Sequence, residues 1–218
     1  TSIIEDNDGY VFTGKINFGG GNFDAYVYKV DLNGDSVWYT NIGTSDYENG
    51  MKLIRVNDGY VISGEYRANE YKAFIAKIDF VGNIVWQKKY AKNITSAESI
   101  IENSTGDLFV CGSIITDSIQ NLFLLKLNSN GDSLWQKNYI RPIPNEGKDI
   151  TFDLSGKLLV LCNSVNENSY DVEVLKLNEN GDSLASYFYG GNNSDYGYSL
   201  EQTIDGGLVI DGMKSSFR

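Results

Sequence analysis

A segment of about fifty residues recurs along the chain with an almost fixed internal spacing, and this repeat limits the folds that the chain can adopt. A lysine returns at intervals of 48, 49 and 50 residues, and a glycine follows each lysine by five positions. The lysines are Lys29, Lys77, Lys126 and Lys176, and the glycines are Gly34, Gly82, Gly131 and Gly181. Each copy is therefore expected to form one small structural unit that packs against its neighbours.

The residues around each repeated glycine resemble the start of a calcium-binding loop. In the first copy, KVDLNGDSVW, the side chains of Asp31, Asn33 and Asp35 alternate as in an EF-hand. An EF-hand also needs a bidentate Glu at its twelfth position, and this position is Ile42 here and Tyr in the other three copies. Apolar, β-branched runs flank each glycine, so the sequence predicts a β-hairpin turn instead.

Each copy contains four short apolar segments separated by Gly, Asn or Asp turns, without a helical apolar stripe of useful length. In the second copy they are MKLIRV, GYVISG, AFIAKID and IVWQKKY, and the first segments of the later copies are ESIIEN, DITFDL and YSLEQT. Four antiparallel strands in about fifty residues match one blade of a β-propeller. The main alternative, a β-solenoid, usually has shorter repeats.

We therefore predict one all-β domain over residues 1–218, a partial β-propeller with about four and a half blades of four antiparallel strands each. The blades are expected at about 1–42, 50–90, 97–139 and 148–189, and a fifth begins at about 196–218. Because an open ring leaves an unpaired blade edge, we expect the chain to be part of a larger ring.

Charge and composition exclude several classes of function. The net charge of −11 argues against binding to nucleic acid or to an anionic membrane surface, and no apolar run approaches the length of a membrane span. The chain has no His, which rules out Ser-His-Asp and Cys-His catalysis and removes the commonest transition-metal ligand. Cys111 and Cys162 lie in apolar strands, where buried free thiols are expected. We predict neither a cofactor nor a metal ion.

Residues that recur in every copy are expected to serve packing. The repeated lysines stand among apolar strand residues, so each should form an ion pair with an acidic residue of the preceding loop. Trp38, Trp86 and Trp135 follow the hairpin turn at the same position in three copies. We expect these rings to pack between blades rather than to form a sugar-binding surface.

Binding residues are expected in the loops, where the repeat is least regular. Tyr47, Tyr71 and Tyr196 are candidate contacts for a glycan or a protein. The segment IRPIPNEGKD (140–149) contains both prolines and adds Arg141 as a candidate, and the GGGNFD segment (19–24) also departs from the repeat. A cation bound by Asp46 with Glu48, or by Asp195 with nearby Asn residues, is an alternative to ordinary turn chemistry.

The repeated segments resemble a known group of proteins. DGYVFTG, DGYVISG, KVDLNGDSVW and FYGGNNSDYGYSLEQT are similar to the DGGY…G…KLD-x-NG…W…YGG repeats of secreted Bacteroidota proteins, which are commonly exported by the type IX system. Ala185, Cys162 and residues 140–149 depart from the Trp, Gly and YGG positions of that pattern. The resemblance covers the whole chain and implies a propeller located outside the cell or on its surface.

The resemblance also implies a modification, because Bacteroidota O-glycosylate Asp-Ser/Thr-apolar triplets. Such triplets place candidate acceptor hydroxyls at Ser36, Ser118, Ser133 and Ser183. Three of the four belong to the repeated hairpin, so turn chemistry is the alternative explanation for them.

The function expected from the sequence is a non-enzymatic extracellular or cell-surface scaffold that mediates protein or glycan interaction, including contact with other domains of a longer chain. The regular repeat, the missing His and the absence of an asymmetric catalytic cluster favour it. One alternative is part of a polysaccharide-acting propeller enzyme with a pair of loop carboxylates about 5 to 10 Å apart, since such pairs form in space rather than in sequence. Another is a structural subunit of an envelope complex. Each of these rests on analogy at the level of fold.

Overall fold

The computed structural model describes residues 2–17, 19, 22–90, 94–166 and 169–215, and these ranges contain eighteen β-strands and no helix. Within them, accordingly, no helix has the length and apolar character needed to cross a membrane. The strands are β1 (Ser2–Asp6), β2 (Gly9–Asn17), β3 (Phe23–Asp31), β4 (Ser36–Asn41), β5 (Tyr47–Val56), β6 (Gly59–Arg67), β7 (Tyr71–Ile78), β8 (Ile84–Tyr90), β9 (Ile94–Glu102), β10 (Leu108–Thr116), β11 (Ile119–Leu127), β12 (Ser133–Tyr139), β13 (Asn145–Phe152), β14 (Leu158–Asn166), β15 (Ser169–Leu177), β16 (Ser183–Tyr189), β17 (Asp195–Gln202) and β18 (Leu208–Lys214).

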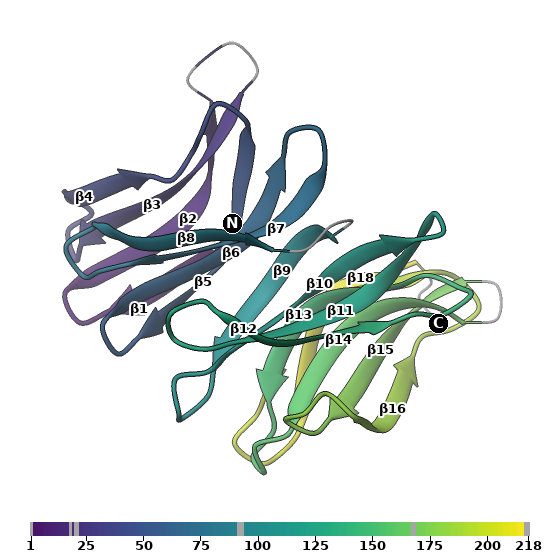
Figure 1. Cartoon of the computed structure of the whole chain (residues 1–218). Coiled ribbons are helices and arrows are strands. Elements are labelled where there is room, and N and C mark those ends of the chain that lie inside the picture. Colours follow the sequence, from purple (N-terminus) through teal and green to yellow (C-terminus); the bar gives the residue numbers. More distant parts are fainter. Residues whose placement is uncertain (1, 18, 20–21, 91–93, 167–168, 216–218) are drawn as a thin grey trace.

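Each set of four consecutive strands forms an antiparallel sheet in sequence order, and this arrangement confirms the predicted propeller blades. Blades 1 to 4 are β1–β4, β5–β8, β9–β12 and β13–β16, and β17 with β18 forms the two described strands of blade 5. A single parallel pairing, between Asn121 of β11 and Asn145 of β13, joins blades 3 and 4. Figure 1 shows the blades following one another from the purple N-terminal sheet to the yellow C-terminal strands.

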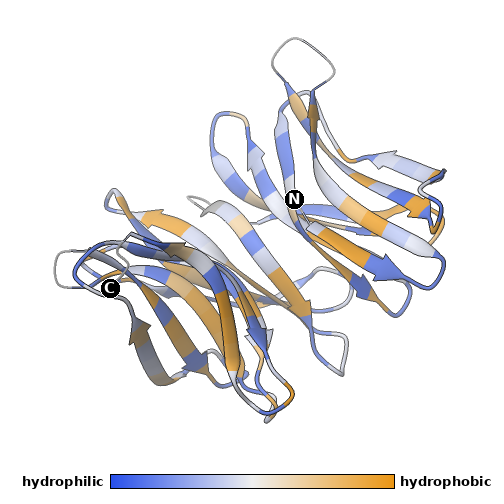
Figure 2. Cartoon of the chain, turned by 180° about the vertical axis from the view of Figure 1, so that it is seen from behind, coloured by the Kyte–Doolittle hydropathy of each residue, from blue (hydrophilic) through white to orange (hydrophobic). Residues whose placement is uncertain are grey.

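The hydrophobic core lies between the blades. One apolar cluster joins each blade to the next, as where Val27 of blade 1 packs in the same cluster as Ile62 and Phe74 of blade 2. Figure 2 shows apolar residues along the strands and hydrophilic residues at the connecting turns. Burial on both faces explains why the middle strands are nearly continuous in apolar residues instead of alternating.

The tryptophans lie between blades, as the sequence predicts. Trp38 packs against Tyr60 of blade 2, and its Nε1 donates a hydrogen bond to the carbonyl oxygen of Phe80 at 3.1 Å. Trp86 repeats this contact with the carbonyl of Ser129 in blade 3 at 3.3 Å. Each indole therefore buries its ring and satisfies its one donor on the neighbouring blade.

The repeated lysines form the predicted ion pairs with acidic residues of the preceding turn. The Nζ to carboxylate distances are 2.6 Å for Lys29–Asp8, 2.7 Å for Lys77–Asp58, 2.9 Å for Lys126–Asp107 and 2.6 Å for Lys176–Asp153. The lysine lies on the third strand and the acid in the turn between the first two, so each pair fixes one end of a blade.

The KVDLNGDSVW segment is a hairpin turn between β3 and β4. The Asp31 carboxylate accepts hydrogen bonds from the backbone N–H groups of Asn33 and Asp35, at 2.8 and 2.9 Å. Gly34 has φ +87°, a conformation that other residues adopt at a cost. The Asp, Asn and Gly of the repeat thus serve turn chemistry, as predicted.

The first strand of every blade lies innermost, and β1, β5, β9, β13 and β17 contact one another in turn around a common axis. From β5 onward, the innermost strands begin upstream of the predicted segments: β5 begins at Tyr47 rather than Met51, and β17 at Asp195 rather than Tyr198. The reason is a β-bulge, one extra residue that interrupts the alternation of the strand. The bulge residues are Met51, Glu98, Lys148 and Tyr198.

Candidate functional site

A cavity of about 560 Å³ lies where the innermost strands of blades 3, 4 and 5 meet. Three of its lining residues, Glu98, Lys148 and Tyr198, are bulge residues of β9, β13 and β17. Bulges re-aim side chains and are common next to active sites. The cavity, called the axial cavity below, is lined by Glu98, Glu146, Lys148, Asn163, Tyr196, Tyr198 and Met213.

Two carboxylates and one ammonium group dominate the charge of the axial cavity. Lys148 Nζ lies 3.0 Å from Glu146 Oε2, and Glu98 Oε1 accepts a hydrogen bond of 2.6 Å from Ser96 Oγ. Burial works to lower the pKa of Lys148, but the nearby charge of Glu98 and the hydrogen bond to Glu146 outweigh it and raise the pKa. Lys148 therefore stays positively charged between two acidic side chains.

The wall of the axial cavity is held by an amide and by stacked rings. Asn163 of β14 accepts a hydrogen bond from the Gly197 N–H at 2.8 Å and donates one to the Gly197 carbonyl at 3.2 Å. This bidentate contact fixes β17 of blade 5 against blade 4. The ring of Tyr196 lies 5.3 Å from that of Tyr170, with 30° between the ring planes.

Asp149 adjoins the axial cavity through its neighbour Lys148. Asp149 is 3% exposed and accepts hydrogen bonds from Ser99 Oγ at 2.6 Å and from the Leu200 N–H at 2.9 Å. Lys52 Nζ lies 3.3 Å from the same carboxylate. Because Asp149 follows Lys148 directly, this buried network fixes the backbone that carries the ammonium group.

The predicted binding tyrosines lie in two places. Tyr196 lines the axial cavity, whereas Tyr47 and Tyr71 gather on blade 2 around Arg67. The guanidinium carbon of Arg67 lies 4.8 Å from the ring centre of Tyr47 and 5.7 Å from that of Tyr71. Binding at these residues stays a prediction.

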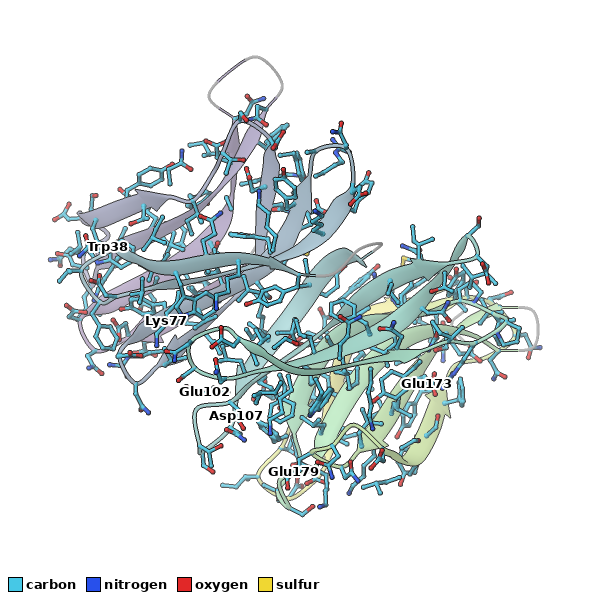
Figure 3. The ribbon with its side chains drawn as sticks, viewed as in Figure 1. Trp38, Lys77, Glu102, Asp107, Glu173 and Glu179 are labelled. Carbon is cyan, nitrogen blue, oxygen red and sulfur yellow. The ribbon has the colours of Figure 1, made fainter. Side chains whose placement is uncertain are left out.

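Arg141 points into the blade rather than outward. Its guanidinium makes a bidentate ion pair with Glu173, at 2.7 and 2.9 Å, and Ser164 and Ser186 also donate to that carboxylate. Burial works to raise the pKa of Glu173, but these donors lower it, so Glu173 is ionised. Figure 3 shows Glu173 within blade 4. Arg141 has its donors engaged, and a role in binding stays a prediction.

The candidate acceptor serines are all exposed. Ser118 lies in the β10–β11 turn with φ +66°, and the other three begin the last strand of a blade: Ser36, Ser133 and Ser183. Their modification stays a prediction. Of the GGGNFD segment, Gly20 and Gly21 lie outside the described residues.

Of the acidic residues considered as cation ligands, Asp46 and Glu48 lie around the start of β5, and Asp195 begins β17 next to Tyr196 of the axial cavity. Asp46 accepts a hydrogen bond from Tyr66, and buried Glu48 accepts two from Thr44. Burial raises the pKa of Glu48 in spite of those bonds. In the part of the chain that the structure describes, no group of three or more His, Cys, Asp or Glu residues is placed to hold a metal ion.

A second cavity, of about 310 Å³, lies between blades 3 and 4 near the hairpin turns. Its lining includes Glu102 and Glu179, which Figure 3 shows toward the lower edge of the molecule. Burial raises the pKa of Glu102. This cavity has no lysine among its lining residues, so we regard the larger axial cavity, with its fixed ammonium group, as the candidate site.

The sequence reasoning missed Glu98, Glu146 and Lys148. A usable signal existed for Glu98 and Lys148: the inner strands of blades 2 to 5 each carry a small residue (Gly50, Ala97, Gly147 or Gly197) followed by a position that differs in every copy. A variable position directly after a nearly constant one marks a place where the repeat is free to carry function.

No protein-family model matches the chain, and no curated protein matches its sequence. Among solved structures, an endo-arabinase from Bacteroides thetaiotaomicron is similar with a TM-score of 0.60 and 14% identity, over 99% of this chain and 89% of that one. The periplasmic gluconolactonase of Pseudomonas aeruginosa is similar with a TM-score of 0.53 and 12% identity, over 93% of this chain and 76% of that one. A Bacteroides caccae protein of unknown function is similar with a TM-score of 0.57 and 15% identity. The match covers 91% of this chain and 64% of that one, so the chain spans less than two thirds of that protein's length. These likenesses show the fold.

The comparisons correct the expectation of a non-enzymatic scaffold. That expectation rested on a regular repeat without His, yet solved structures of similar architecture include enzymes, among them the endo-arabinase and the gluconolactonase. The regularity reflects how blades pack, whereas the side chains at the axis differ from blade to blade. The findings favour the enzyme alternative over the scaffold.

Proposed function

We propose that this chain is the propeller of a glycoside hydrolase, and that the axial cavity binds and cleaves a polysaccharide. The observation that carries the proposal is the placement of Glu98 and Glu146 in one cavity together with the Lys148 ammonium group, on which both acids act. The structural likeness to an endo-arabinase supports it at the level of fold.

Cleavage of a glycosidic bond requires two carboxyl groups. One gives a proton to the leaving oxygen, and the other either activates a water molecule or attacks the anomeric carbon, so that water is consumed and one bond to oxygen is broken. Glu98 and Glu146 are the two acidic side chains that line the axial cavity. We assign them this pair of roles.

The other lining residues bind and orient the sugar. Lys148 offers a fixed positive charge to sugar oxygens, which helps to hold the ring in a reactive position. Tyr196 and Tyr198 offer aromatic faces with a hydroxyl at the edge, a combination suited to the apolar face and polar rim of a sugar ring. We further propose that the protein acts outside the cell or on its surface, where polysaccharides are found.

A panel of glycans tests the proposal. The purified protein is incubated with linear and branched arabinans, xylans, pectins and β-glucans, and new reducing ends are counted against a heat-unfolded sample. We expect at least one glycan to be cleaved with a linear time course. If the folded protein releases no reducing ends from any of them, the proposed function is wrong.

A further inference from the structure

Blades 1 and 2 carry a cluster of cations and aromatic rings on their surface. Lys15 Nζ lies 5.2 Å from the ring centre of Phe23 and 5.4 Å from that of Tyr47, whose hydroxyl it contacts at 3.0 Å. Arg67 lies over the other side of the cluster, against Tyr47 and Tyr71, and donates to the Tyr71 hydroxyl at 3.2 Å. We call these five residues the rim patch.

The cations of the rim patch differ from most others in the chain. Among the described residues, neither Lys15 nor Arg67 has a carboxylate within ion-pair distance, whereas the repeated lysines and Arg55, Arg141 and Lys148 all do. The nearest acid whose charge reaches Arg67 is Glu65. Two exposed cations without an acidic partner are notable on a protein of net charge −11, because their charge is available to an anionic ligand.

The rings of the rim patch are accessible as well. Tyr71 is 43% exposed, and Phe23 and Tyr47 are half-buried with their rings 5.8 Å apart. A sugar ring has apolar C–H faces that pack on aromatic rings, so this part of the patch suits a carbohydrate. A charged peptide needs the cations but has no use for a row of flat rings.

The rim patch and the axial cavity open on the same face of the propeller. Tyr47 begins β5 and Arg67 ends β6, while Glu146 and Tyr196 lie one residue inside the starts of β13 and β17. The innermost strands run in the same direction around the axis, so their first residues share one face. In Figure 1 this face carries the β6–β7 connection, opposite the β3–β4 and β7–β8 turns.

We propose that the rim patch binds a sugar unit that bears a carboxylate, and that the polysaccharide cleaved in the axial cavity therefore contains uronic acid. The carboxylate lies between Lys15 and Arg67, and the sugar ring packs on Tyr47 and Tyr71. This inference rests on the proposed function for its link to cleavage, whereas binding itself is independent of turnover.

Calorimetric titration of the whole chain tests the patch. The probes are polygalacturonate, neutral linear arabinan and poly-L-glutamate, and the variants are Lys15→Gln and Arg67→Gln. The control is Lys157→Gln, which removes the same charge from the β13–β14 turn on the opposite face. We expect polygalacturonate affinity to fall by about tenfold in each patch variant and to stay within about twofold in the control. Urea unfolding midpoints show whether the variants are folded. Because Lys15 is exposed, Lys15→Gln is expected to fold and still tests the patch even if Arg67→Gln unfolds.

Three results would overturn the inference. The first is equal affinity of the wild type for arabinan and polygalacturonate. The second is an equal loss of polygalacturonate affinity in the control and in the patch variants. The third is binding of poly-L-glutamate that Lys15→Gln and Arg67→Gln weaken as much as they weaken polygalacturonate binding, which would make the patch a site for acidic peptides. A Glu146→Gln variant separates the two proposals. If it and the wild type bind polygalacturonate alike and the wild type cleaves no glycan, the patch stands and the proposed function fails. If both bind alike and only the wild type cleaves, both proposals stand.

Discussion

Lys52 Nζ lies 3.3 Å from Asp149 Oδ1, although the whole of blade 3 separates their two blades in the sequence. Asp149 also accepts hydrogen bonds from Ser99 of blade 3 and from Ser199 and Leu200 of blade 5. One buried carboxylate thus ties together the inner strands of four blades. This is possible because those strands converge on the axis, and it makes Asp149 the main polar link there.

We expect Asp149→Ala to lower the free energy of unfolding by about 3 to 5 kcal/mol, since a buried N–H and an ammonium group both lose their acceptor. Lys52→Gln should cost only about 1 kcal/mol, because the Lys52 side chain is 34% exposed and water replaces part of the interaction. Urea unfolding measures both changes. Equal losses in the two variants would contradict the central role of Asp149.

A buried acid in blade 1 predicts a pH dependence of stability. Asp6 receives hydrogen bonds from Lys29 at 2.9 Å, from Arg55 at 2.8 Å and from the Tyr60 hydroxyl. Burial works to raise the pKa of Asp6, but these donors outweigh it and hold the pKa far below the ordinary value. The carboxylate therefore stabilises the fold above the unfolded-state pKa of about 3.9, and this contribution is lost as the pH falls further.

The variant Asp6→Asn should lose about 3 kcal/mol of unfolding free energy at pH 7, because Arg55 loses its acid and buried Lys29 keeps only the exposed Asp8 as an acidic partner. The difference from the wild type should shrink as the pH falls below about 4. Urea unfolding at pH 7, 4 and 2 gives the comparison. A difference that stays constant over this range would mean that Asp6 acts through packing alone.

Blade 4 departs from the other blades at one cross-strand pair. Blades 1 to 3 place a glycine opposite an aromatic ring, and blade 4 places Cys162 opposite Glu173. The glycine pairs are Gly14–Tyr26, Gly64–Phe74 and Gly112–Phe123. A Cβ at Gly112 would lie 2.1 Å from the Ser96 carbonyl oxygen of the inner strand and 2.8 Å from the Phe123 ring, so both neighbours exclude a side chain there.

We expect Glu173→Phe alone to be strongly destabilising, because the ring meets Cys162 and Arg141 loses its partner. Adding Cys162→Gly should recover stability, with a coupling energy of at least about 1 kcal/mol in a double-mutant cycle. Unfolding free energies of the two single variants and the double variant provide the cycle. Additive effects would show that the two positions are independent.

The blades were predictable because every copy meets the same local requirements. Turn glycines such as Gly34 need positive φ, and lysines such as Lys77 need a partner, so these residues recur and reveal the period. The bulges were harder to predict from a single copy, because an extra residue such as Lys148 resets the alternation on which strand prediction depends, and only the comparison of copies marks its position.

The site was harder to predict than the fold, because it depends on which copies meet at the axis. Glu98 and Glu146 belong to different blades and different positions of the repeat, and only the stacking of blades brings them to one cavity. Arg141 was singled out for its loop, but its partner Glu173 lies 32 residues away and replaces an aromatic position. Contacts between copies are set by blade geometry, which a single sequence does not contain.

The central claim is that Glu98 and Glu146 together cleave a glycosidic bond, and the kcat/KM of their Gln variants on a glycan that the wild type cleaves tests it most directly. Glu102→Gln is the matched control, since Glu102 lies on the same strand as Glu98 but lines the other cavity. The account predicts a fall of about 10²-fold or more for Glu98→Gln and for Glu146→Gln, and a change within about twofold for the control. A kcat/KM equal to that of the wild type in either Glu98→Gln or Glu146→Gln would contradict it.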